Sequence, residues 1–157
     1  MPSALILRDA QLSDIPALAA LLGELLQQEH EFTADLVTQA RGLELLLARQ
    51  DQARIIVAES GGRIIVMAAL HYTISTALGA RVATLEDVIV TSSARGDGVG
   101  TRLMSHVIET ARADGAVRIT LLTDHDNHAA QHFYRAHGFT KSTMVPYRRL
   151  LVRSETA

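Results

Sequence analysis

Three glycines alternate along the stretch Gly96-Asp97-Gly98-Val99-Gly100. A β-type apolar run, residues 83–90, precedes this stretch, and an amphipathic helical pattern follows it over residues 98–113. Glycine has no Cβ, so backbone can approach a ligand closely, and the free N–H groups and dipole of a helix start favour an anion. The pattern therefore predicts a phosphate or pyrophosphate site with Arg95 and Arg102 at its rim. The glycines alone leave open a flexible turn with solvated arginines.

Two familiar phosphate loops are excluded by spacing. A P-loop requires a Gly-Lys pair, and the chain contains none. The dinucleotide pattern G-x-G-x-x-G, started at Gly96, requires glycine where the chain has Thr101. A generic nucleotide-binding domain is therefore disfavoured.

Hydrophobic periodicity predicts the element order β-α-α-β-β-β-α-β-α-β-β over a single domain, residues 1–157. Turn signals at Ser60-Gly61-Gly62 indicate a hairpin, and helices between other strands indicate crossovers. We therefore expect an α/β fold, with a mixed sheet of the α+β kind. One or two closing strands are expected from Phe139 onward, around Pro146.

Composition narrows the function. The formal net charge of −2 gives no general footprint for nucleic acid, and the absence of cysteine excludes disulfides and thiolate nucleophiles. No apolar run approaches the ~20 residues that span a bilayer, and the first residues lack a secretory-signal profile. We expect a cytoplasmic protein that acts on small molecules, with no nucleic-acid and no membrane partner.

Two motifs carry a family resemblance. Leu85-Glu86-Asp87-Val88-Ile89-Val90 followed by Arg95-Gly96-x-Gly98-x-Gly100 resembles the central signature of the GNAT superfamily of acetyl-CoA-dependent N-acyltransferases, in its polyamine and aminosugar acetyltransferase branch. The run from Asn127 through Tyr134 to Phe139 resembles the asparagine-to-tyrosine helix of that family. The order of strands and helices is also the order of the family.

The resemblance implies acetyl-CoA as co-substrate and assigns residues to it. The pyrophosphate is expected on the loop, and the pantetheine arm beside the strand end and the later helix; the residues are Arg95, Gly96, Asp97, Gly98, Val99, Gly100 and Thr101 for the loop, and Val88, Ile89, Val90, Asn127 and Ala130 for the arm. Asn127 is also a good helix cap, and the two roles are compatible.

Acyl transfer to an amine needs a base, because an alkylamine with a pKa near ~10.4 is almost fully protonated at neutral pH. Glu86 is our candidate, acting directly or through water. In a regular strand it shares one face with Val88 and Val90, while Asp87 points the other way and ranks second. Alternatively, Glu86 pairs with a neighbouring cation such as Arg81.

Tyr134 is the candidate acid for the leaving thiolate, and this role rests on the resemblance. By composition alone, the same tyrosine is amphipathic core. The oxyanion is expected to meet a backbone N–H near Val88.

The acceptor is less constrained. Glu29 and Glu31 stand between the first two helices, where carboxylates suit a cationic amine, although a solvated helix end explains them equally well. His71 faces either the acceptor or the core. We expect no metal: His128 and His132 have helical ligand spacing, but the glutamate of H-E-x-x-H is absent, and thioester chemistry needs none.

The sequence therefore predicts an N-acetyltransferase acting on a primary amine of a small molecule or on an amino terminus. The alternative is a non-catalytic acyl-CoA-binding or sensing module, which would need neither Glu86 nor Tyr134. The apolar segment Met144 to Val152 suggests a strand edge that joins two copies into a homodimer.

Overall fold

A computed structural model of the chain describes residues 3–27 and 35–152. The chain divides into two compact units, residues 1–122 and 123–157, and each is described by itself. The assignment of one domain over residues 1–157 stays a prediction.

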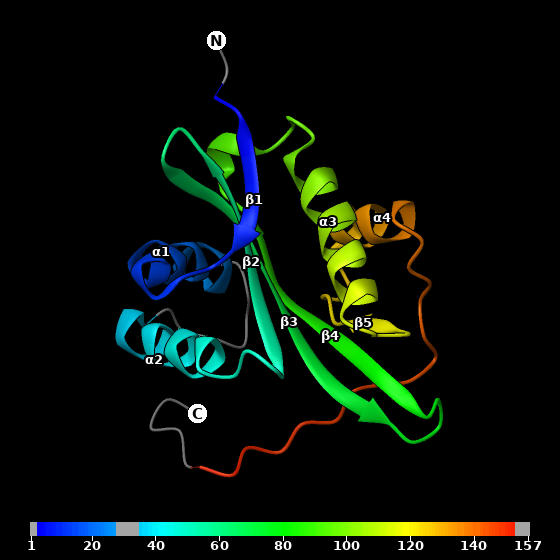
Figure 1. Cartoon of the computed structure of the whole chain (residues 1–157). Helices are drawn as coiled ribbons and strands as arrows, with labels where there is room; N and C mark the ends of the chain where they lie inside the picture. The colour runs from blue at the N-terminus through cyan, green and yellow to red at the C-terminus, as the bar shows by residue number, and fades with distance from the viewer. Residues whose placement is uncertain (1–2, 28–34, 153–157) are drawn as a thin grey trace. The chain divides into compact units, whose positions relative to one another are not determined.

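The first unit contains a five-stranded sheet in the order β1-β2-β3-β4-β5 (Figure 1). The strands are β1 (Leu5–Asp9), β2 (Ala53–Ser60), β3 (Arg63–Ser75), β4 (Ala80–Val90) and β5 (Ile119–Leu121). The first four pair antiparallel, and β5 pairs parallel to β4. The mixed sheet and the β2–β3 hairpin confirm the predicted fold class.

Helices cover both faces of this sheet. The helices α1 (Ile15–Leu26) and α2 (Leu36–Leu47) lie on one face, and α3 (Val99–Ala113) lies on the other (Figure 1). On the first face, leucines of α1 and α2 pack with alternate residues of the central strands; this cluster includes Leu18, Leu22, Leu43, Ile55, Val57, Met67 and Ile89. The alternation of strand side chains places the next residues, such as Leu70 and Leu85, on the α3 face.

Local sequence explains where the helices begin. Pro16 lies in the first turn of α1, where its missing N–H removes no helix hydrogen bond. The α2 helix is capped by Asp35, whose Oδ1 accepts the backbone N–H of Val37 at 3.1 Å and of Thr38 at 3.4 Å. The α3 helix begins directly after the glycine loop, as the pattern predicts.

A charged cluster joins β1 to β2 and to the start of α1. The guanidinium of Arg8 donates to both oxygens of Asp14, at 2.7 and 3.0 Å, and to Oε2 of Glu59 at 2.9 Å. Asp14 also accepts the backbone N–H of Gln11 at 2.7 Å. The hydrogen bonds from Arg8 hold the pKa of the nearly buried Asp14 carboxyl below its usual value. This cluster was not predicted from the sequence.

Over residues 123–152, the second unit contains one helix, α4 (His128–Ala136), as predicted. The expected closing strands are wrong for its described part, because residues 139–152 make no strand pairing. A strand exists only through a partner. The apolar side chains of this segment are exposed instead; Met144, Tyr147 and Leu151 have exposed fractions of 86, 97 and 89%.

The Arg8 cluster gives a pH-dependent prediction. Because the folded-state pKa of Asp14 lies below its ordinary value of 3.8, the ionised carboxyl stabilises the fold above that pH. This contribution is lost as the pH falls through the folded-state pKa. We expect Asp14→Asn to lower the free energy of unfolding at pH 7 by about 1–3 kcal/mol. Urea unfolding at pH 7 and again below pH ~3.8 checks this, since the difference must shrink in acid.

Asp35→Asn is the matched control, because Asp35 is an exposed cap and asparagine caps a helix equally well. Equal losses of stability in the two variants would contradict the special role of the Arg8–Asp14 pair.

Candidate functional site

The glycine loop connects β4 to α3 and leaves its backbone open. A short 3-10 turn, Ser92–Ala94, follows β4, and the Nε–H of Arg95 donates to the carbonyl of Val90 at 3.1 Å. Gly96 and Gly98 adopt left-handed φ values of 91° and 72°. A Cβ built on either glycine would meet no atom within 4 Å. The space beside the backbone is therefore free for a ligand.

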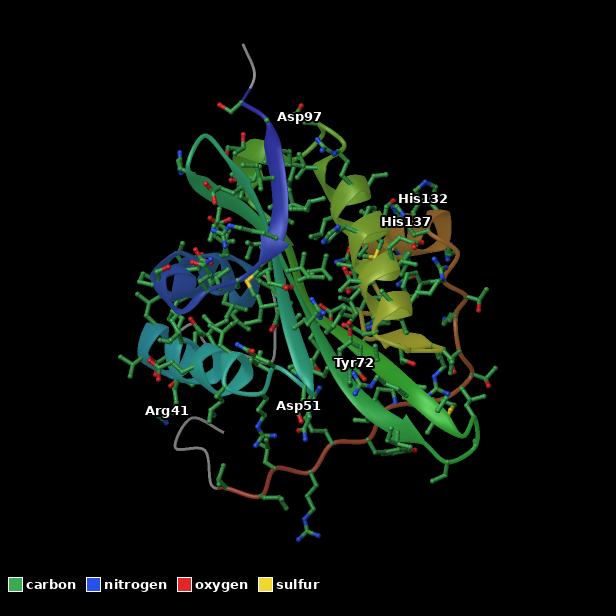
Figure 2. The ribbon with its side chains drawn as sticks, viewed as in Figure 1. Arg41, Asp51, Tyr72, Asp97, His132 and His137 are labelled. Atoms are coloured by element: carbon green, nitrogen blue, oxygen red, sulfur yellow. The ribbon has the colours of Figure 1, made fainter. Side chains whose placement is uncertain are left out.

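This geometry fits a pyrophosphate. Gly98 is the N-cap of α3, so the first N–H groups of a 15-residue helix face the loop without a helical acceptor. Residues Arg95–Gly98 are all exposed, including Asp97, which Figure 2 shows at the start of α3. The positive φ of Gly96 and Gly98 explains why these two positions carry no side chain.

The strand before the loop contains a β-bulge. Ala69 pairs with Glu86 and Met67 pairs with Ile89, so one residue of β3 faces two residues of β4, Asp87 and Val88. Asp87 has a φ of 54°, the one non-glycine residue with positive φ in the described chain. Such backbone is costly for an L-residue and is typical of functional sites.

The bulge corrects one sequence expectation. In a regular strand, Glu86 would share its face with Val88 and Val90, but the observed pairing places Glu86 on the face of Ile89. That face carries α1 and α2, whereas Val90, opposite Val66, lies on the α3 face. The bulge shifts the alternation by one residue, and it therefore also removes the argument that ranked Asp87 behind Glu86 by direction.

Glu86 lies against His71 rather than Arg81. Its Oε2 is 3.5 Å from Nε2 of His71, and 57% of the Glu86 side chain is exposed. Arg81 instead stacks over the ring of Tyr72, at 4.9 Å from the ring centroid. Because residues 81 and 86 point to opposite faces of β4, the predicted alternative pairing of Glu86 with Arg81 is wrong.

A second polar cluster, partly buried, lies at the end of α3, and no sequence pattern indicated it. The hydroxyl of Tyr72 donates to Oδ2 of Asp114 at 2.5 Å, and Nε of Arg54 is 2.7 Å from the same oxygen (Figure 2 labels Tyr72). Burial, followed by the bond to Asp114, raises the pKa of the Tyr72 phenol. The cluster ties β2 and β3 to the end of α3.

In the second unit, Asn127 and Tyr134 lie at the two ends of α4. Oδ1 of Asn127 accepts the backbone N–H of Ala130 at 3.1 Å, which confirms its capping role. The ring of Tyr134 packs edge-on against Phe133 and Phe139, with centroid distances of 5.5 and 5.8 Å. Burial raises the pKa of the Tyr134 phenol, so this group stays protonated at neutral pH.

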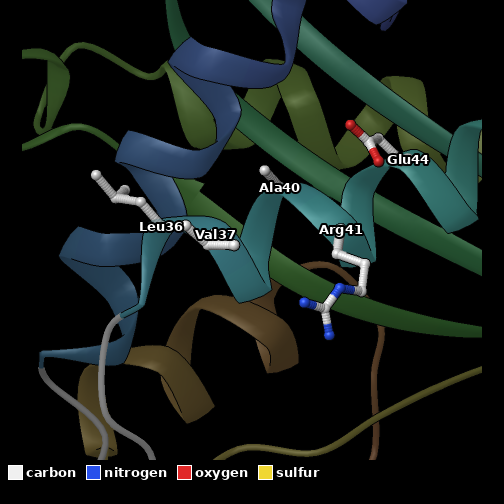
Figure 3. Close-up of a pocket in the computed structure, with 5 residues that line it drawn as sticks. All are labelled: Leu36, Val37, Ala40, Arg41 and Glu44. Atoms are coloured by element: carbon white, nitrogen blue, oxygen red, sulfur yellow. The ribbon is translucent and has the colours of Figure 1, made fainter.

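Two hollows in the described surface are lined by residues other than Glu86. One, of about 390 Å³, is an open depression on α2 lined by Leu36, Val37, Ala40, Arg41 and Glu44 (Figure 3). Another, of about 430 Å³, lies between α1 and the β2–β3 hairpin; its lining includes Glu24, Arg63 and Thr91. Thr91 immediately precedes the turn into the glycine loop, so the lining of the second hollow includes a residue that is close to the loop along the chain.

The remaining sequence expectations concern the acceptor carboxylates, a metal site and the membrane. Glu29 and Glu31 lie outside the described residues. Within residues 3–27 and 35–152, no three His, Asp or Glu side chains gather as metal ligands would; His132 and His137 both belong to the α4 region (Figure 2). In the same ranges, no helix combines the length and apolarity needed to cross a bilayer.

The bulged strand, the glycine loop and the helix after it follow one another in the order that the sequence resemblance implies, within a mixed sheet covered on both faces (Figure 1). The sequence profile of the acetyltransferase (GNAT) family matches residues 18–139. This chain belongs to that family, and it is an acetyl-CoA-dependent acyltransferase.

Individual proteins resemble this chain in sequence or in fold. An uncharacterized N-acetyltransferase of Bacillus subtilis, YhfO, is 31% identical over 137 residues, which are 87% of this chain and 91% of the relative. A possible acetyltransferase from Clostridium difficile superposes with a TM-score of 0.85 at 15% identity, over 95% of this chain and 99% of its own. A protein described as a transcriptional regulator from Bacillus halodurans gives 0.82 at 28% identity, over 94 and 100%.

The loop geometry predicts the effect of adding one methyl group. Gly98→Ala forces a left-handed residue to carry a Cβ, which costs about 1–2 kcal/mol, at the helix start assigned to the pyrophosphate. We expect coenzyme A to bind roughly tenfold more weakly. Isothermal titration with coenzyme A measures the loss.

Gly115→Ala is the matched control, since Gly115 is exposed at the other end of α3 with a φ of 88° and equal room for a Cβ. It should lower thermal stability by a similar amount and leave coenzyme A affinity unchanged. A parallel loss of affinity in both variants would refute a local role for Gly98.

Proposed function

We propose that this protein transfers an acetyl group from acetyl-CoA to a primary amine of a small molecule or to an amino terminus, with Glu86 as general base and Tyr134 as general acid. The observation that carries the proposal is the half-exposed Glu86 carboxylate on the bulged end of β4, shortly before the turn Ser92–Ala94. Family membership supports the donor and the reaction class.

The base is needed on the acceptor side. The amine attacks only when neutral, and at neutral pH it arrives mostly as an ammonium ion with a pKa near ~10.4. Glu86 accepts the amine proton, directly or through a water molecule. Its exposure leaves the carboxylate accessible to a substrate, and its neighbour His71 offsets the carboxylate charge only when the imidazole is protonated.

The acid is needed on the leaving side. The C–N bond forms as the C–S bond breaks, and the departing sulfur gains the electron pair and needs a proton. The protonated phenol of Tyr134 supplies it, and the raised pKa of this phenol keeps the proton in place until then. Acetyl-CoA supplies the acyl group; the protein supplies the two proton transfers and the orientation.

The cofactor assignments divide between the β4–α3 connection and the start of α4. The open backbone from Arg95 to Thr101 holds the pyrophosphate, and Val88, Ile89 and Val90 run beside the pantetheine arm. Asn127 uses Oδ1 for its cap, and its amide nitrogen is the atom assigned to the arm near Ala130. Arg95 supplies charge to the rim while its Nε–H anchors the loop on Val90.

The acceptor is assigned as a small cationic amine, through Glu29, Glu31 and His71. Carboxylates attract an ammonium group, and the chain carries 17 acidic and 15 basic residues, which disfavours a large acidic acceptor. A sensing role without turnover is the second candidate, because one structural relative at 28% identity is described as a transcriptional regulator.

The protein is proposed to work in the cytoplasm as a homodimer. The exposed apolar run that contains Leu150, Leu151 and Val152 supports the dimer, because adjoining exposed apolar side chains favour contact with another chain. Sedimentation equilibrium should then give twice the mass of the 17.0 kDa chain.

The catalytic assignment predicts the behaviour of two variants. We expect Glu86→Gln and Tyr134→Phe each to lower amine-dependent thiol release from acetyl-CoA on the order of a hundredfold, because each removes one proton transfer. The assay follows thiol release across polyamines, aminosugars, amino acids and short peptides. Coenzyme A affinity should stay within about twofold, since neither change touches the loop.

Glu109→Gln and Tyr147→Phe are matched controls on exposed positions, and they should retain full activity. Full activity of Glu86→Gln would overturn the base assignment. Tight coenzyme A binding without thiol release for any amine would favour the sensing role.

A further inference from the structure

His71 and Glu86 are diagonal neighbours on one face of the sheet. His71 on β3 pairs with Thr84, and Glu86 on β4 pairs with Ala69, two residues from His71. Residues 69 and 71 point to the same face, and diagonal pairs on adjacent antiparallel strands are within reach of long side chains. The face is the one that carries α1 and α2.

One nitrogen of the His71 imidazole has no hydrogen-bond partner among the described residues. Nε2 of His71 is inaccessible to solvent and makes no hydrogen bond to any residue within 3–27 and 35–152. The carboxylate oxygen Oε2 of Glu86 is 3.5 Å away, beyond the 2.7–3.2 Å of a good N–H···O bond. A buried polar nitrogen in this state is costly, so a short movement of the half-exposed Glu86 side chain would be favourable.

The regular register before the bulge places Glu86 beside His71, and the bulge decides which later residues share their face. Without the extra residue in β4, the strand alternation after Glu86 would continue unchanged, and the residues that follow would face the other way. With it, Glu86 and Ile89 share the face of His71, and Ile89 is buried. Glu86 therefore shares its face with a buried hydrophobic side chain and with the buried Nε2.

We propose that His71 is a positioning residue for the base: its Nε2–H donates to Oε2 of Glu86 and holds the carboxylate so that Oε1 faces the acceptor amine. This inference rests on the proposed function of Glu86. His71 touches the carboxylate and does not itself take the amine proton. The neutral tautomer with the hydrogen on Nε2 makes this bond.

A near-isosteric pair of variants separates this role from a packing role. Glutamine and methionine side chains have similar length and shape, but only the amide of His71→Gln can donate a hydrogen bond to Glu86. With acetyl-CoA and the fastest amine of the panel, we expect His71→Met to lower kcat about tenfold or more. His71→Gln should retain most of the activity, and KM for acetyl-CoA should change little in either. His106→Met, on α3 at the opposite face, controls for the loss of a histidine as such.

A double-mutant cycle distinguishes failure of this inference from failure of the proposed function. If His71 acts through Glu86, His71→Met should have no further effect in the Glu86→Gln background. An equal loss in both backgrounds, or equal activity of His71→Gln and His71→Met, overturns the inference while Glu86 remains the base. Full activity of Glu86→Gln overturns the proposed function and this inference together.

A spectroscopic measurement tests the inference without enzymatic turnover. It remains decisive if the His71 variants fail to fold or if no amine in the panel is acetylated. In histidine ¹⁵N spectra of the intact protein at neutral pH, we expect His71 as the Nε2–H tautomer, with an Nε2 shift that moves in Glu86→Gln. An Nε2 without hydrogen, or a resonance indifferent to Glu86→Gln, overturns the inference.

Discussion

The bulge at Asp87 and Val88 is the constraint on which the arrangement of the site depends. One extra residue in β4 must be accommodated opposite β3, and the chain does so with an unfavourable positive φ at Asp87. The consequence is a shift of alternation by one residue. Ile89 therefore shares the face of Glu86, toward α1 and α2, and Val90 reaches the α3 face just before the chain turns into the glycine loop.

Two polar clusters hold the frame around this irregular strand. Arg8 and Asp14 join β1 to the start of α1, and Tyr72 with Asp114 joins β3 to the end of α3. Each cluster is partly buried and its charges are paired, which is the condition under which such polar groups stabilise a unique arrangement.

The glycine loop and the proposed base Glu86 lie at the same end of β4 but have different physical requirements. The loop needs open backbone and no side chains, and Gly96 and Gly98 provide both. A general base needs an accessible carboxylate in a fixed position, and the proposed base Glu86 is exposed with its Oε2 3.5 Å from the buried Nε2 of His71. Within the second unit, burial raises the pKa of the Tyr134 phenol, and Asn127 caps the helix that carries it.

The sequence by itself determined the features that are encoded locally. Glycine spacing indicated the loop, apolar periodicity indicated the five strands and the helices, and Asn127 indicated its cap, because turns, helices and caps depend on neighbours along the chain. Only the tertiary structure decided the bulge, the contact of Glu86 with His71 in place of Arg81, and the lack of pairing over residues 139–152. These depend on which strand lies beside which and in what register. A single sequence carries no direct record of that, since one extra residue in a strand reverses the faces of all that follow.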